Sequence, residues 1–129
     1  MITIKTLQKN RARRKELVKK LDKLVGDIVK LRDKKCIVCG TTERLTPGHL
    51  FSRIAYSTRW ELHNVWAQCM SCNFRHELDA YPMLQEVSKR IGVKEIDELH
   101  RLYSTPVQFK TYQLQILYDE FLVIKKTYD

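Results

Sequence analysis

The stretch QCMSCNFRHE, residues 68–77, places two cysteines, an asparagine, a histidine and a glutamate within ten positions. Its Cys-x2-Cys pair has a counterpart upstream, and 29 residues separate the two pairs. Thiolates at this spacing on a tight turn can share one tetrahedral ion, and two such turns complete a shell of four sulfurs. Two disulfides or four unrelated thiols are the alternatives. We predict one structural Zn²⁺ per chain, bound by Cys36, Cys39, Cys69 and Cys72.

Charge is unevenly distributed along the chain. The chain has 129 residues and a formal net charge of +9. Residues 1–35 contain 13 Lys or Arg and 4 Asp or Glu, whereas residues 36–129 contain 11 of each kind. Such an asymmetry favours a polyanionic partner, with nucleic acid ahead of an anionic membrane surface. The basic side chains that we expect to contact DNA from this segment are Lys9, Arg11, Arg13, Arg14 and Lys15.

Composition also bears on the compartment of the protein. No apolar run approaches the ~20 residues of a membrane span, and the N-terminus lacks the apolar segment of a secretory signal. We therefore expect a cytoplasmic protein without a membrane partner. In that compartment cysteines more often bind metal than form disulfides.

The periodicity of apolar residues predicts several helices. Residues 5–32 form one helix, whose apolar face contains Leu17, Leu21, Leu24, Ile28 and Leu31. Helical character returns from about residue 69 and continues to a stop at Gly92, with Leu78, Tyr81, Leu84, Val87 and Ile91 on one face. Pro82 lies either in the first turn of a new helix or at a kink. Residues 94–104 and 111–129 form the last two helices.

Between the first two helices, residues 36–68 contain turns and short extended pieces. The prediction is one compact α+β domain with three segments. Residues 1–35 form a basic N-terminal helix or arm, residues 36–92 the zinc-bound core, and residues 93–129 a C-terminal helical tail.

Any catalytic chemistry needs a second site, because four sulfurs leave the zinc ion no open position. His49 follows a Pro-Gly turn, and Asn73 and Glu77 lie one helical turn apart with His76 beside them. A histidine that faces oxygen and nitrogen ligands suits metal-assisted hydrolysis of phosphodiesters. The guanidinium groups of Arg53 and Arg59 suit phosphate.

These residues resemble a known family. The order Cys-x2-Cys, Gly-His, Asn, Cys-x2-Cys-Asn is similar to the HNH, or His-Me finger, nuclease motif in its zinc-knuckle form. More narrowly, the stretches LVGDIVKLRDKKCIVCG, PGHLFSR, TRWELHNVWAQCMSCN and IGVKEIDELHRLYSTPVQFKTYQLQILYDEF resemble the NinG (Rap) family of phage recombination proteins. The resemblance covers about residues 22–120.

The resemblance implies a ββα-metal core and a nuclease that acts on branched DNA, such as Holliday junctions and D-loops. By this likeness His49 is the general base and Asn64 helps to orient it. Asn73, with Glu77 and His76, would bind a catalytic Mg²⁺ or Mn²⁺ ion, although Gly48 stands where many HNH enzymes have a metal-binding Asp. Symmetrical resolution of a four-way junction would suit a homodimer.

Two other classes of function stay open on the sequence alone. One is a zinc-stabilised DNA-binding module without catalysis, and the other is a module whose basic helix binds an acidic protein. Loss of cleavage on removal of His49 distinguishes the nuclease from both. Salt-dependent DNA binding distinguishes the first two from the third.

Overall fold

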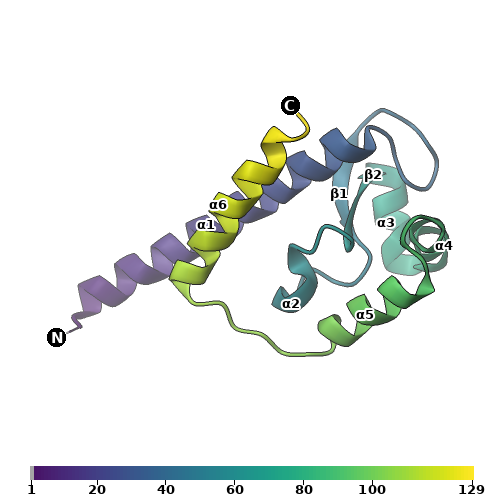
Figure 1. Cartoon of the computed structure of the whole chain (residues 1–129). Helices are drawn as coiled ribbons and strands as arrows, with labels where there is room; N and C mark the ends of the chain where they lie inside the picture. The colour runs from purple at the N-terminus through teal and green to yellow at the C-terminus, as the bar shows by residue number, and fades with distance from the viewer. Residues whose placement is uncertain (1) are drawn as a thin grey trace.

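A long helix begins the fold. The computed structural model describes residues 2–129, and its first helix, α1, spans Ile4–Asp33 over 30 residues (Figure 1). It begins where the Thr3 hydroxyl accepts a hydrogen bond from the Thr6 amide at 3.1 Å, and it ends at Lys34, whose φ of 63° is left-handed. The helix predicted over residues 5–32 is confirmed.

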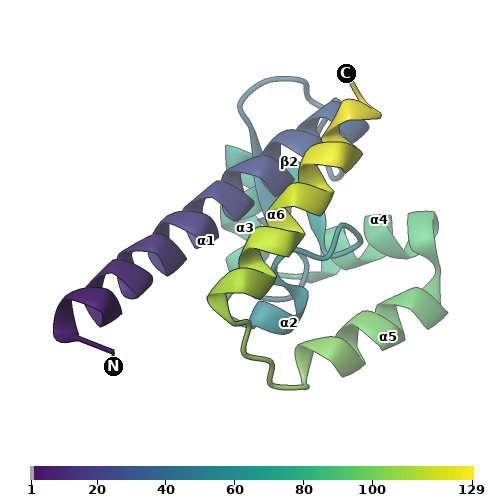
Figure 2. The ribbon, with the colours of Figure 1, turned by 60° about the vertical axis from the view of Figure 1, so that its left-hand side comes forward.

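The two halves of α1 have different surroundings. The N-terminal half projects beyond the rest of the chain, whereas α6 (Thr111–Lys126) lies against the other half (Figures 1 and 2). Leu21 and Ile28 are completely buried there, as are Leu114 of α6 and Val65. This first apolar core also contains Leu17, Leu24, Val25, Val29, Trp60 and Phe121.

A short hairpin lies beside α1. Strands β1 (Leu45–His49) and β2 (Val65–Cys69) pair antiparallel, with Leu45 opposite Cys69 and His49 opposite Val65. The connection between them carries the single turn of α2 (Tyr56–Arg59), and α3 (Met70–Leu78) follows β2 without a gap. The order strand, strand, helix therefore places both cysteine pairs near one end of the hairpin.

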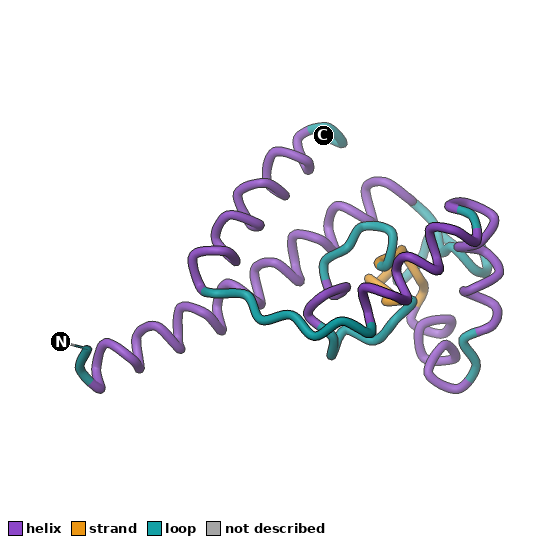
Figure 3. The backbone as a smooth tube through the Cα atoms, turned by 60° about the horizontal axis from the view of Figure 1, so that its bottom comes forward, coloured by secondary structure: helices purple, strands orange, loops and turns teal. Residues whose placement is uncertain are grey.

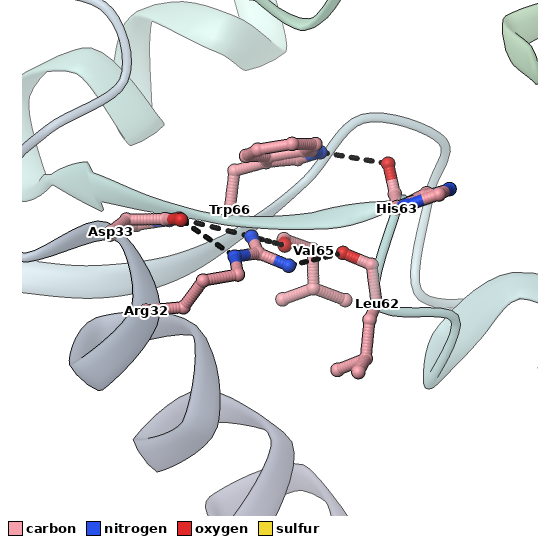
Figure 4. Close-up of polar contacts among 7 residues, drawn as sticks. Arg32, Asp33, Leu62, His63, Val65 and Trp66 are labelled. Carbon is pink, nitrogen blue, oxygen red and sulfur yellow. Dashed lines mark hydrogen bonds and ion pairs between the residues drawn. The ribbon is translucent and has the colours of Figure 1, made fainter. Parts of the chain in front are cut away.

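Polar contacts fix the C-terminal end of α1 to β2. Arg32 donates hydrogen bonds to the carbonyl oxygens of Leu62 at 2.9 Å and Val65 at 2.8 Å, while the Asp33 carboxylate accepts one from the Ala67 amide at 2.9 Å. The Arg32 guanidinium also lies 4.3 Å from the centre of the Trp66 ring. Figure 4 shows this side chain reaching from the helix end toward the strand. The hairpin thus has a fixed orientation on α1.

The helical segment after β2 is divided. The single face predicted from Leu78 to Ile91 is wrong, because α3 ends at Leu78 and α4 (Tyr81–Ile91) starts anew with Pro82 in its first turn. Leu78 and Tyr81 are 79% and 60% exposed. Gly92, with a φ of 84°, ends α4, and α5 (Val93–Tyr103) follows. A second apolar core lies here, formed by Ile37, Leu50, Trp66, Met83, Val87 and Ile96.

Figure 3 shows the long connection from α5 to α6, which returns the chain to α1. Across residues 2–129, no helix has both the length and the apolar character needed to cross a membrane.

The packing of α1 gives a first prediction. Leu21→Ala should lower the free energy of unfolding by about 2–5 kcal/mol, because it leaves a cavity in the core between α1 and α6. Leu7→Ala, at a 45% exposed position of the same helix, should change it by less than about 0.5 kcal/mol. Urea unfolding of the zinc-loaded chain measures both values, and equal effects would contradict this assignment of the core.

Candidate functional site

The four cysteines converge at one point. The candidate ligand atoms of Cys36, Cys39, Cys69 and Cys72 all lie within 4.8 Å of one another. None of the four forms a disulfide, and the Cys39 and Cys69 sulfurs are 3.7 Å apart. Four sulfurs at 2.3 Å from a tetrahedral Zn²⁺ would be separated by roughly 3.8 Å. The geometry is therefore consistent with the predicted structural zinc site, and the disulfide alternative is wrong.

Local backbone structure presents the sulfurs to one another. In the first pair, the Cys36 amide donates to the Thr41 carbonyl at 2.8 Å, and Gly40 closes the turn with a φ of 78°. In the second pair, the Cys69 sulfur caps α3 by accepting a hydrogen bond from the Cys72 amide at 3.4 Å. Each Cys-x2-Cys pair is thus folded by its own turn or helix start.

The pKa values of two cysteines in the cluster depart from the ordinary value in opposite directions. Burial raises the pKa of the Cys72 thiol above its ordinary value. Burial also acts to raise the pKa of Cys36, but backbone hydrogen bonds outweigh it and lower that pKa to about 7. Metal binding requires thiolates, so loading of Zn²⁺ would release protons. All four positions of a tetrahedral ion would be filled by sulfur, which favours a structural role over a catalytic one.

His49, the predicted general base, ends β1 and is half-buried. Its Nε2 lies 2.9 Å from the carbonyl oxygen of Arg59. Because a carbonyl oxygen only accepts hydrogen bonds, Nε2 carries the proton, and Nδ1 of the neutral ring is left as the acceptor. Burial lowers the pKa of His49 below its ordinary value, with opposing contributions from the Arg59 carbonyl and from Asp22. The ring is therefore neutral and fixed in one tautomer at neutral pH.

Asp22 is a site residue that sequence reasoning missed. Its carboxylate, on α1, accepts hydrogen bonds from Arg59 Nε at 2.9 Å and Nη2 at 2.6 Å, and from Trp60 Nε1 at 2.9 Å. Burial acts to raise its pKa, but these bonds outweigh it and hold the pKa below the ordinary value. Because Arg59 also supplies the carbonyl that binds His49, Asp22 fixes the backbone on which the imidazole depends.

This ion pair bears on the predicted phosphate contacts. The Arg59 side chain is only 11% exposed and its guanidinium is bound by Asp22, so it serves to join α2 to α1. Arg53 is exposed, as are Lys9, Arg11, Arg13 and Lys15 on α1, and within residues 2–129 none of these side chains forms an ion pair. These five remain free to meet an anionic partner.

Asn64 is fully buried and joins the two segments that carry His49 and its acceptor. The Asn64 Oδ1 accepts from the Phe51 amide at 2.8 Å, and its Nδ2 donates to the carbonyl oxygens of Phe51 and Thr58, both at 3.0 Å. Phe51 follows His49 by two residues, and Thr58 precedes Arg59. Asn64 therefore orders the backbone around the imidazole without contacting the ring through a hydrogen bond.

The three candidate ligands on α3 are placed differently. Asn73 donates through Nδ2 to the Thr46 hydroxyl at 3.1 Å, which leaves its Oδ1 without a partner among the described residues. Glu77 is exposed one turn further along. His76 bonds through Nε2 to the Leu50 carbonyl at 3.2 Å, and its Nδ1 is buried without a partner in the described chain. No hydrogen bond between His49 and Asn73 occurs within residues 2–129; they contact different neighbours.

The structure explains why glycine occupies position 48. A Cβ at this position would lie 2.0 Å from Oε1 of Gln68, whose side chain crosses over Gly48 from β2. Gln68 is fully buried, and neither its Oε1 nor its Nε2 has a partner within residues 2–129. The space that a side chain at position 48 would enter is thus occupied by a neutral carboxamide.

The cysteine geometry predicts one Zn²⁺ per chain. Cys72→Ser should lose most of this metal and lower the Tm by more than about 10 °C, because structural zinc contributes on the order of 10 kcal/mol to folding. Elemental analysis and thermal melting provide the readouts. Met70→Ser, at a 60% exposed position of the same helix, is the control and should retain the metal. Full stability of metal-free Cys72→Ser would contradict a structural site.

The Asp22 contacts predict an effect on His49. Asp22→Asn should lower the pKa of His49 further, because it removes a negative charge that raises this pKa and leaves the Arg59 charge uncompensated. The measurement is an NMR titration of the imidazole Cε1 proton. Asp27→Asn, which removes an acid paired with Lys23 elsewhere on α1, should leave the His49 titration unchanged. An unshifted pKa in Asp22→Asn would show that the charges do not reach the ring.

Comparison with known proteins bears on the identity of the chain. A family profile described as the bacteriophage lambda NinG protein matches residues 3–127. No curated protein and no solved structure gives a significant match. The match extends over nearly the whole chain, including both cysteine pairs and the helices on either side of them. The chain belongs to the NinG family.

Proposed function

We propose that this chain is a divalent-metal-dependent endonuclease of the HNH type that hydrolyses phosphodiesters in branched DNA. The observation that carries the proposal is the hydrogen bond from His49 Nε2 to the Arg59 carbonyl. It leaves Nδ1 as a proton acceptor on a half-buried ring. A fixed, neutral imidazole is the group that general-base activation of water requires.

The protonation state of His49 supports its role as the general base. Because burial lowers the pKa of His49, the ring is in its basic form at neutral pH. In the proposed step, Nδ1 takes a proton from the water that attacks the phosphorus in line with the leaving oxygen. Asn64 and Asp22 hold the segment that carries the Arg59 carbonyl, which accepts the hydrogen bond from the ring. Neither residue needs to touch the reacting atoms.

The catalytic ion would be held at the start and middle of α3. The Asn73 Oδ1 and the exposed Glu77 carboxylate are oxygen donors, which suit Mg²⁺ or Mn²⁺. His76 fits this role less well, because its Nδ1 is turned into the protein interior. When bound, a divalent ion would neutralise charge that develops on the phosphate and the leaving oxygen.

DNA affinity would come from the exposed half of α1. Lys9, Arg11, Arg13 and Lys15 project from a helix that extends beyond the globular part (Figure 2). Contacts of this kind are made with phosphates and are independent of base sequence. That property suits an enzyme that recognises the shape of a branch. Ile116, Leu122 and Val123, exposed on α6, offer an apolar surface for a homodimer, which would suit symmetrical cleavage.

One observation favours a second candidate, a zinc-stabilised DNA-binding module without catalysis. Across residues 2–129, the four cysteines are the only group of three or more His, Cys, Asp or Glu side chains close enough to share an ion. The proposed catalytic site has one acidic ligand, Glu77, and relies on neutral donors and water for the rest. A DNA-binding module would need the zinc cluster and the basic helix alone.

A cleavage assay distinguishes the two candidates. A four-way junction and a matched linear duplex are incubated with zinc-loaded protein, with or without Mg²⁺. We expect Mg²⁺-dependent cutting, faster on the junction, and a loss of at least about 100-fold in rate for His49→Ala. Zinc content and DNA affinity should be unchanged in this variant.

His63→Ala is the matched control, because it removes a histidine that pairs at the surface with Glu95. It should cut at nearly the wild-type rate. If wild-type protein binds DNA and does not cut it at any Mg²⁺ concentration, the non-catalytic candidate is correct. If His49→Ala cuts DNA at the wild-type rate, the imidazole is excluded as the general base.

A further inference from the structure

A groove of about 660 Å³ lies between α1, the start of α2 and the connection from α5 to α6. Three parts of the chain form it: Arg14 of α1, the segment 54–57 at the start of α2, and the connection 103–109 between α5 and α6. Figures 1 and 3 show this connection passing below α2 on its way to α6. The volume is in the range of small-ligand sites, which are about 300–1,000 Å³.

Each aromatic ring that lines the groove packs near another aromatic ring. Tyr103 stacks on Phe51 with 5.2 Å between ring centres and 22° between planes. Tyr56 and Phe109 both pack against the buried Trp60, at 5.7 and 5.9 Å. The pairs with Trp60 are tilted, at 44° and 51°, and the guanidinium of Arg59 also lies 5.4 Å from the Tyr56 ring centre, so Tyr103 is the lining ring with a stacked neighbour behind it. Supported aromatic side chains of this kind are the platforms on which unpaired bases stack.

The polar groups of the groove suit a nucleotide. The Arg14 guanidinium lies 5.9 Å from the Tyr56 ring centre and donates to the Phe109 carbonyl. None of the lining residues, all within the described chain, is acidic. Between residues 2 and 129, no hydrogen-bond partner is found for the backbone amides of Val107 and Gln108. The lining thus combines a positive charge with aromatic side chains and a segment whose backbone amides have no protein partner among the described residues.

The groove and the proposed catalytic histidine are linked through α2, because Tyr56 lines the groove and Arg59, three residues further on, supplies the carbonyl that binds His49. Asp22, which binds Arg59, follows Arg14 by eight residues, a distance of about 12 Å along the helix. The unpaired basic side chains of α1 continue in the same direction beyond Arg14. A strand that runs from α2 to the basic half of α1 would meet the groove, because residues of both elements line it.

We propose that this groove binds the unpaired bases of single-stranded DNA at a branch point. Charge complementarity with Arg14 and α1 identifies the occupant as a polyanion, and the aromatic lining identifies bases as the part that enters. The inference rests on the proposed function for the choice of DNA as partner. It goes further by assigning recognition of branched DNA to unpaired nucleotides, which a linear duplex does not present.

Fluorescence anisotropy of the full-length, zinc-loaded chain without Mg²⁺ tests the proposal independently of cleavage. Two duplexes are compared, one with a bulge of three thymidines and one with a bulge of three abasic nucleotides. They have the same charge and differ only in the bases. We expect the thymidine bulge to bind roughly tenfold more tightly, because stacking of each base contributes to affinity.

Tyr103→Ala should bring the two affinities to within about twofold, whereas Tyr103→Phe, which keeps the ring, should retain the difference. Tyr112→Ala is the matched control, because Tyr112 is 60% exposed on α6 and does not line the groove. A wild-type ratio near one would overturn the proposal without any variant. Equal ratios for Tyr103→Ala and Tyr112→Ala would also overturn it. Failure of Mg²⁺-dependent cleavage alone would affect only the nuclease assignment.

Discussion

The convergence of four cysteine sulfurs is the constraint on which the rest of the structure depends. A two-stranded hairpin with five residues in each strand is at most marginally stable alone. The cysteines join the turn before β1 to the start of α3, across 29 intervening residues. Arg32 and Asp33 then fix β2 to α1. With the hairpin held at both places, its far end can present His49 in a defined orientation.

Much of this architecture was readable from local patterns. The spacing of the cysteines indicated the sulfur cluster, because each pair is organised by its own short turn. The Leu17–Leu21–Leu24–Ile28 repeat indicated the buried face of α1 for the same reason, since about three turns of one helix determine it. The break between α3 and α4 was the exception. Pro82 allowed either a kink or a new start, and the structure shows a new start, with α3 ending at Leu78 and α4 beginning at Tyr81.

The contacts around His49 were not readable, because they join residues far apart in the chain. Nothing local marks Asp22 as different from Asp27, although one holds Arg59 across 37 positions and the other faces Lys23. Arg59 looked like a phosphate contact because its partner was invisible in the sequence. The place of Asn64 in the motif suggested support for the histidine, and the structure shows that this side chain orders the adjoining backbone. The direct meeting of His49 and Asn73 stays a prediction.

The crossing of Gln68 over Gly48 has a consequence for how this site can change over time. Any side chain at position 48 would meet the carboxamide, so an aspartate there requires the end of the Gln68 side chain to move aside. Positions 48 and 68 are therefore coupled in space: a residue larger than glycine at the first requires Gln68 to shift or to be replaced by a shorter side chain. Because Gln68 is fully buried, shortening it alone would leave a void beneath the strand.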